Sequence, residues 1–200
     1  MLGNPLAVVI GADSSTVSEL AAFARWTNLS EMTFLLQPRS ADADYRVRIF
    51  TPVAELPFAG DPTLGSCHTW LSSGGRPKSD EIVQECEAGL IHIRRDNERL
   101  SFEAPELRRS GPVERDTLTP AIKDLRLTSD DIADTKVDND PGWLAVLLRS
   151  RADVLALRPD FSVLSGLRVG REGRVYVELV EDRIWIGGDV TTCIEGVAAL

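Results

Sequence analysis

Glu31 is the first candidate for chemistry in this chain, because it stands between a predicted helix and an apolar strand. A carboxylate at the edge of a cleft loses part of its hydration, which raises its pKa and suits it to moving protons near neutral pH. The alternatives are a solvated glutamate in a turn, or an ion-pair partner of Arg46 or Arg48 on the neighbouring strand. The sequence leaves these interpretations open.

A second candidate is the run Gly60-Asp61-Pro62-Thr63, which begins a predicted helix. Backbone N–H groups and the positive end of the helix dipole at this point would suit a substrate carboxylate. Asp61 can be interpreted as a catalytic group or as an N-cap ahead of Pro62 in the first helical turn. If Asp61 and Glu31 face the same cleft, their repulsion raises the pKa of at least one of them and opposes an anionic substrate.

The sulfur and imidazole groups form no metal-binding or disulfide pattern. The three cysteines, Cys67, Cys86 and Cys193, include no CxxC pair, so we interpret them as reduced core thiols. His68 lies too far along its helix to replace a group at the helix start, since one turn rises about 5.4 Å. With His92 the only other histidine, a metal centre is not expected. The tryptophans are interpreted as core or interface residues: Trp26, Trp70, Trp143 and Trp185.

Hydrophobic periodicity predicts the elements that position these candidates. A buried strand over 6–10 precedes a helix that begins with a capping box at Thr16 and Glu19. Strands are predicted over 32–36 and 45–50, a buried helix over 62–71, and a hairpin with its turn near 96–97.

Prolines and polar residues around 105–115 place a boundary between an N-terminal part, 1–110, and a C-terminal part, 111–200. The second part is poorer in distinct elements. It is predicted to hold a helix over 120–125, a strand over 143–148, a helix after Pro159, and a hairpin of 174–180 with 183–186.

Composition excludes several classes of function. A net charge of -9 and a pI near 4.8 would repel a phosphate backbone, so nucleic acid is not expected as a partner. No stretch approaches the roughly 20 apolar residues that cross a bilayer. The first residues lack the basic region of a signal peptide, and we therefore expect a cytoplasmic protein.

Several segments, in order, resemble the phenazine-biosynthesis PhzF family: GNPLAVV at 3–9, NLSEMTF at 28–34, PFAGDPTLG at 57–65, QEC at 84–86, AGL at 88–90 and WIGG at 185–188. The resemblance implies an α+β, diaminopimelate-epimerase-like fold of two similar halves, each a curved sheet around a central helix. It also implies a homodimer that acts on a small cyclic or amino-acid-like substrate without metal or organic cofactor. A glutamate at the position of Glu31 would move the proton, Asp61 would be its catalytic partner, and Gly60, Pro62 and Thr63 would bind the substrate.

The sequence departs from the family pattern in two places. The family has a histidine at the position of Asp61, and an ionised aspartate can only accept hydrogen bonds. The strand ahead of Gly3 and the acidic motif of the second half, with its central helix, are not found, so the second half is expected to be incomplete. A sheet without its helix must bury its concave face against a partner chain or collapse into a smaller sheet. The alternative to an isomerase is therefore a non-catalytic small-molecule-binding protein or a degenerate remnant.

Overall fold

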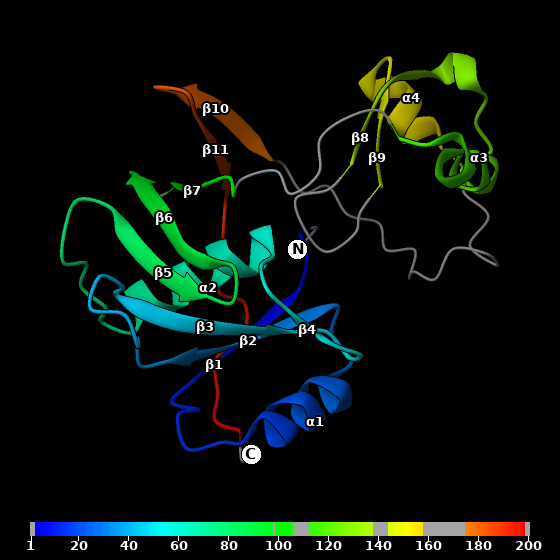
Figure 1. The fold of residues 1–200 in the computed structure, drawn as a ribbon. Helices are drawn as coiled ribbons and strands as arrows, with labels where there is room; N and C mark the ends of the chain where they lie inside the picture. The colour runs from blue at the N-terminus through cyan, green and yellow to red at the C-terminus, as the bar shows by residue number, and fades with distance from the viewer. Residues whose placement is uncertain (1–2, 98, 106–112, 138–143, 158–174, 199–200) are drawn as a thin grey trace. The chain divides into compact units, whose positions relative to one another are not determined.

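The computed structural model describes residues 3–97, 99–105, 113–137, 144–157 and 175–198. The chain divides into two compact units, one formed by residues 1–105 with 171–200 and the other by residues 106–170. Figure 1 shows the elements of each unit. The C-terminal residues belong with the N-terminal part because their strands pair with its sheet.

The first unit begins with a β-α-β arrangement. Strand β1 (Leu6–Ile10) leads through helix α1 (Val17–Thr27) to β2 (Glu31–Leu36), and the two strands pair in parallel. The predicted capping box is confirmed, since the side chains and backbones of Thr16 and Glu19 bond reciprocally. Helix α1 covers one face of the sheet and buries Leu20 and Ala24 against Phe34 and other apolar side chains. Full burial of one such leucine contributes roughly 1.5–3 kcal/mol.

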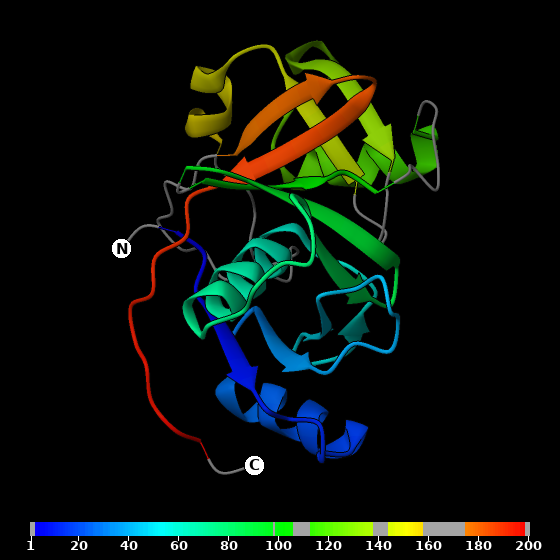
Figure 2. The same ribbon diagram turned by 90° about the vertical axis from the view of Figure 1, so that its left-hand side faces the viewer.

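The rest of this sheet curves around helix α2 (Gly60–Ser72). Its further strands are β3 (Tyr45–Phe50), β4 (Glu55–Leu56), β5 (Ile82–Cys86), β6 (Gly89–Asp96) and β7 (Arg99–Glu103). The order β1-β2-β3-β5-β6-β7-β11-β10 has β1 at one end, yet α2 contacts β1 and β2 as well as β7 and β11. Contact with strands so far apart in the order requires a curved sheet, and α1 lies on its other side (Figure 2).

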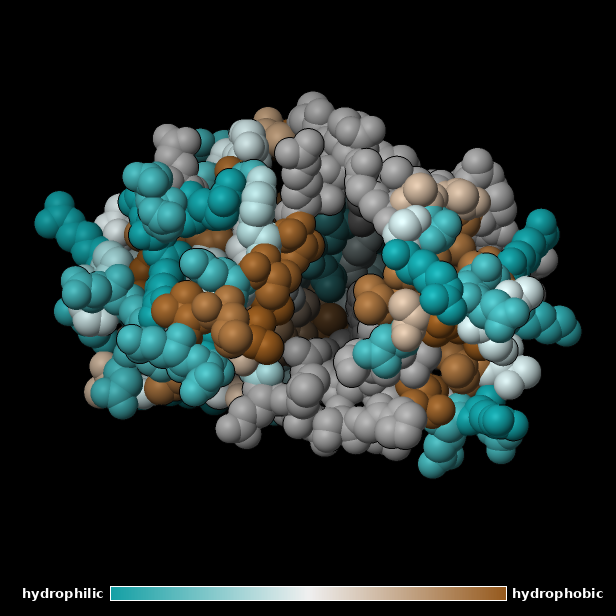
Figure 3. Space-filling view, turned by 90° about the horizontal axis from the view of Figure 1, so that it is seen from above, coloured by the Kyte–Doolittle hydropathy of each residue, from teal (hydrophilic) through white to brown (hydrophobic). Residues whose placement is uncertain are grey.

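Strands β10 (Tyr176–Val180) and β11 (Arg183–Gly188) complete the sheet as the predicted hairpin. Strand β11 pairs with β7, which leaves β10 at the edge. Val177 and Leu179 on β10 are both exposed. Apolar side chains reach the surface among polar ones on the face seen in Figure 3.

The second unit contains α3 (Arg115–Asp124), a 3-10 turn (Ser129–Asp131), the hairpin β8 (Ile132–Val137) and β9 (Leu144–Leu148), and α4 (Arg151–Ala156). Helix α3 begins before the predicted start and includes Pro120. Strand β8 was not predicted, and the predicted helix after Pro159 lies outside the described residues. Within the described part of this unit no helix is as long as α2.

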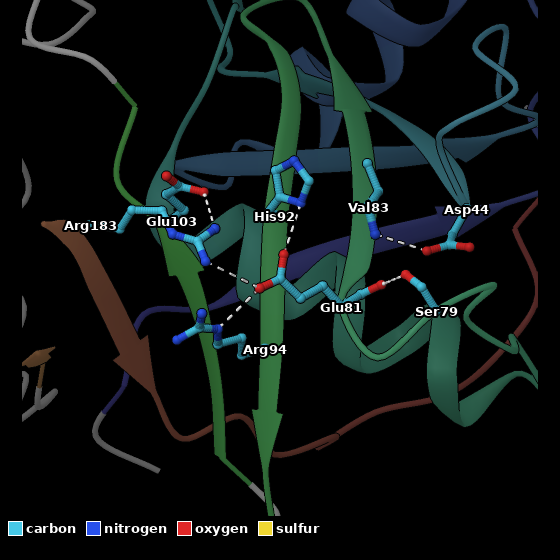
Figure 4. A network of polar contacts seen from close by, with 8 residues as sticks. All are labelled: Asp44, Ser79, Glu81, Val83, His92, Arg94, Glu103 and Arg183. Atoms are coloured by element: carbon cyan, nitrogen blue, oxygen red, sulfur yellow. Dashed lines mark hydrogen bonds and ion pairs between the residues drawn. The ribbon is translucent and has the colours of Figure 1, made fainter. Parts of the chain in front are cut away.

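Charged side chains tie the strands together on the sheet face away from α2. The Glu81 carboxylate lies 3.0 Å from Nδ1 of His92, 3.2 Å from Nε of Arg94 and 3.7 Å from the guanidinium of Arg183 (Figure 4). The Arg94 guanidinium stacks 3.7 Å above the ring of Trp185. Because these groups are partly exposed, each contact contributes little, but together they link the residue before β5 to β6 and β11.

A place in the core is wrong for two single residues. Trp26 is 78% exposed on α1 and stacks on Phe23, so it is not a core residue and its interpretation as an interface residue stays a prediction, whereas Trp185 is fully buried. Cys193 is exposed and lies beyond the last strand, in contrast to the buried Cys67 and Cys86. None of the described helices is long and apolar enough to cross a membrane.

Candidate active site

The candidate site lies where helix α2 begins and where β1 and β2 begin. In the parallel pair, Leu6 stands opposite Glu31, so residues just before β1 and the first residue of β2 share one edge of the sheet. From this edge the side-chain amide of Asn4 donates a hydrogen bond to Oδ2 of Asp61 in the first turn of α2. The structure therefore brings the start of α2 to the sheet edge that carries Glu31.

Glu31 faces the α2 side of the sheet. Side chains alternate along a strand, so Glu31 shares its face with Thr33, whose hydroxyl accepts a 2.9 Å hydrogen bond from Ser66 on α2. Arg46 and Arg48 stand opposite Leu36 and Phe34 in the β2–β3 ladder and so project from the other face. Glu31 is therefore not positioned by an ion pair with either arginine.

Arg48 has a different partner from the one considered in the sequence. Its guanidinium donates two hydrogen bonds to the carboxylate of Glu55, of 2.7 and 2.6 Å. This contact raises the pKa of Arg48. The ion pair fastens β3 to β4 on the face away from Glu31.

Helix α2 starts earlier than the sequence predicted, and this changes the role of Asp61. Its N-cap is Ala59, which offers no side-chain acceptor, and Gly60 is the first helical residue. Asp61 is thus the second residue of the helix, and its interpretation as the N-cap is wrong. Gly60 packs against the ring of Phe102, where an added Cβ would meet the ring at 3.1 Å. This close approach lets the helix start sit directly on β7.

Pro62 and Thr63 are buried beneath the helix start. The Thr63 hydroxyl donates a 2.9 Å hydrogen bond to the Ala59 carbonyl and accepts one of 3.1 Å from the Gln84 side chain. Gln84 accepts a further bond of 3.0 Å from the Tyr45 hydroxyl. Burial, together with the neighbouring Cys67 thiol, raises the pKa of Tyr45 well above its usual value. This buried chain of bonds fixes the first turn of α2 on the sheet.

The close packing of α2 on β1 depends on one glycine. An added Cβ at Gly65 would collide with the side chain of Leu6, whose neighbour across the sheet is Glu31. The helix can approach the sheet edge at this point because the residue has no side chain. The distance from helix start to Glu31 is therefore set partly by Gly65.

The thiol and imidazole on α2 do not join the site. Burial raises the pKa of Cys67 to about 12, so this thiol stays protonated near neutral pH. His68 bonds instead to the hydroxyl of Thr192, 3.0 Å from its Nε2. Among the residues that the structure describes, no cluster of three or more His, Cys, Asp or Glu could hold a metal ion.

The sequence model of the phenazine biosynthesis-like protein family, PhzC-PhzF, matches residues 1–171. The chain belongs to this family. The described part of the molecule accordingly has the α+β, diaminopimelate-epimerase-like fold that the sequence predicted, with α2 as the central helix of the first half.

Relatives of this PhzF-family chain include named isomerases. It is 41% identical over 172 residues to "Antisense-enhancing sequence 1" of Schizosaccharomyces pombe. The match covers 82% of this chain and 58% of that protein. It is 35% identical over 169 residues to the trans-2,3-dihydro-3-hydroxyanthranilate isomerase of Pseudomonas chlororaphis, again covering 82% and 58%. The chain therefore spans 58% of the length of these curated relatives.

Solved structures show the same fold. The crystal structure of a PhzF-family phenazine biosynthesis protein from Enterococcus faecalis matches with a TM-score of 0.67 at 17% identity. The match covers 94% of this chain and 89% of that one.

Asn4 is the site residue that sequence reasoning missed. Its segment carried part of the resemblance to the PhzF family, but nothing in the local pattern predicted a contact across 57 positions. An asparagine and a proline directly ahead of a buried strand were the available signal, since such residues favour a turn at a sheet edge. The run at 139–142, which resembles a fragment of the second family motif, lies outside the described residues.

Proposed function

We propose that this chain is a PhzF-family isomerase that moves a proton between two carbons of a small cyclic or amino-acid-like substrate. The observation that carries the proposal is the gathering of Glu31, Asn4 and Asp61 at one sheet edge beside the start of α2. Glu31 faces the helix side of the sheet, where its carboxylate can take a proton from a bound substrate and return it. No metal or organic cofactor is needed for this step.

Asp61 and the helix start would position the substrate. The first-turn N–H groups of Gly60 and Asp61, with the helix dipole, favour a substrate carboxylate. Asn4 holds the Asp61 carboxylate through its amide, so Asp61 would take the place of the histidine that the family pattern implies, as a weaker partner in the proton transfer. Pro62 and Thr63, which are buried, would hold the first turn of α2 in place beside the substrate.

The second candidate is a non-catalytic small-molecule-binding protein. The hydrogen bond between Asn4 and Asp61 favours it, because this carboxylate is already engaged and repels an anionic ligand. In that case the chain would bind a ligand at the helix start without exchanging its protons. One experiment separates the two candidates.

The experiment follows deuterium from solvent into substrate by NMR. We expect purified protein to label trans-2,3-dihydro-3-hydroxyanthranilate, or a member of a small amino-acid panel, in deuterated water. Glu31→Gln should abolish labelling, whereas Glu87→Gln, which removes the same charge from an exposed turn, should not. Binding without labelling in a folded sample would support the non-catalytic candidate instead.

The assembly and location of the protein are also proposals. The family resemblance supports a homodimer, and the cytoplasmic location is proposed from the sequence alone. Light scattering on a purified sample tests the first, and a mass equal to one chain would contradict it.

A further inference from the structure

A cavity of about 370 Å³ lies beside the second half of α2, within the first unit. This volume suits a small organic molecule. The cavity is lined by residues of α2, of β6, of β7 and of the C-terminal segment: His68, Leu71, Ser72, Arg95, Leu100 and Val190. Three of these side chains are apolar and three carry hydrogen-bond donors.

Arg95 reaches this cavity because of strand alternation. Ile91 and Ile93 on β6 are buried on the face toward α2, and Arg95 follows them on the same face at the end of the strand. It stands opposite Leu100 of β7 in the ladder. Its Nε donates a 3.0 Å hydrogen bond to the carbonyl of Asn97, and within the described part of the chain it forms no ion pair with a carboxylate.

His68 lines the same cavity from α2. Its Nε2 lies 3.0 Å from the Thr192 hydroxyl, a contact that joins the helix to the C-terminal segment. Asp189 of that segment bonds to Arg99 and to the hydroxyl of Tyr176, each at 3.3 Å. The exposed Arg95 guanidinium thus supplies a positive charge at the cavity in a chain whose net charge is -9.

We propose that this cavity binds a small organic carboxylate with an apolar body. The carboxylate would lie against the Arg95 guanidinium, His68 and the Ser72 hydroxyl, where charge-assisted hydrogen bonds form. The apolar body would cover Leu71, Leu100 and Val190. His68 lies seven residues, about 10 Å of helix, beyond Asp61. The site is thus separate from the proposed active site and does not depend on the proposed function.

The test uses the two histidines of the chain as reporters, since only His68 lines the cavity. Isobutyrate is titrated into the full-length protein while the ring C–H resonances of His68 and His92 are followed by NMR. His68→Gln assigns the signals. Phosphate, which lacks the apolar body, and isopropanol, which lacks the charge, are titrated in parallel.

We expect isobutyrate to shift the His68 resonance in a saturable way and to leave that of His92 in place. Arg95→Gln should weaken this binding about tenfold, since it removes a charge-assisted contact. Arg95→Lys should retain most of it, and Arg25→Gln, which removes a similar charge from exposed α1, should change nothing.

Three results would overturn the proposal. One is an unmoved His68 resonance at saturating isobutyrate. Another is equal binding by phosphate or by isopropanol, which would mean that charge alone or apolar contact alone accounts for it. The third is unchanged affinity in Arg95→Gln with a spectrum that shows the native fold.

Discussion

The two ends of α2 have charged groups of opposite sign near them and are held in different ways. The N-terminal end has Asp61, bonded to Asn4, near the sheet edge where Glu31 begins β2. The second half of the helix carries His68 and lies beside Arg95 of β6, with which it lines a cavity. Both arrangements match the helix dipole, which favours anions near its N-terminus and cations toward its C-terminus. The dipole opposes an anion toward the C-terminal end, so binding of a carboxylate there would depend on the Arg95 cation of β6.

The two ends also differ in their internal support. Beneath the N-terminal end, buried hydrogen bonds join Thr63, Gln84 and Tyr45. In the described part of the chain, the other end is joined to the C-terminal segment by one side-chain hydrogen bond, between His68 and Thr192. Since a proton-transfer site must be held precisely, the better supported end is the one expected to perform chemistry.

The largest expected effect separates the two ends by function. Glu31→Gln should lower deuterium exchange at least about 100-fold, because it removes the positioned base. It should leave isobutyrate binding near His68 unchanged. Arg95→Gln should weaken isobutyrate binding and leave deuterium exchange unchanged. Both assays are carried out on both variants. Loss of both properties in either variant would show that the ends are coupled.

The next effect concerns the support under the N-terminal end. Gln84→Met should lower the free energy of unfolding by about 2 kcal/mol, since it leaves the buried hydroxyls of Tyr45 and Thr63 short of partners. His68→Gln at the other end should change it by less than about 0.5 kcal/mol. Urea denaturation measures both.

A double variant provides the control for this prediction. Adding Tyr45→Phe to Gln84→Met removes the stranded hydroxyl and should recover part of the lost stability. Further loss of stability in the double variant would contradict the role given to this hydrogen bond.

A smaller effect concerns the acid at the helix start. Asp61→His should raise the exchange rate about tenfold, because an imidazole can donate hydrogen bonds and removes a charge that repels an anionic substrate. Asp61→Asn, which can no longer take up or return a proton, should lower the rate in the same NMR assay. A rise in Asp61→Asn would mean that the carboxylate takes no part in the reaction and only repels the substrate.

The smallest effect tests the buried thiol between the two ends. The pKa of Cys67 is about 12 in the folded chain, against an ordinary value of 9.0, because burial disfavours the thiolate. Unfolding therefore releases a proton above pH 9, and stability should fall by roughly 1.4 kcal/mol per pH unit there. Urea denaturation at pH 8 and pH 10 measures this fall.

Cys67→Ala is the control for the pH effect. The variant should lose less stability between the two pH values, although Cys86 and Tyr45, whose pKa values are also raised by burial, keep part of the dependence. An equal loss in the variant and the native chain would show that Cys67 is not responsible.

The sequence by itself determined the family and the first half of the fold, and it singled out Glu31 and Asp61 as candidates for the site. Alternating and helical patterns are local, and so β1, the capping box of α1, β3 and the β10–β11 hairpin follow directly from them. The segments around Glu31 and Asp61 carried the resemblance for the same reason.

The tertiary structure decided how those residues are arranged. Asn4 meets Asp61 because a parallel strand pair and a helix packed on it converge, and no local pattern encodes a contact between distant segments. Ala59 is the N-cap, and Gly60 lies against Phe102 of β7, a contact between segments far apart in the chain. The place of β11 beside β7, and the cavity beside His68, also depend on long-range packing, which sums contributions from many residues far apart in the chain.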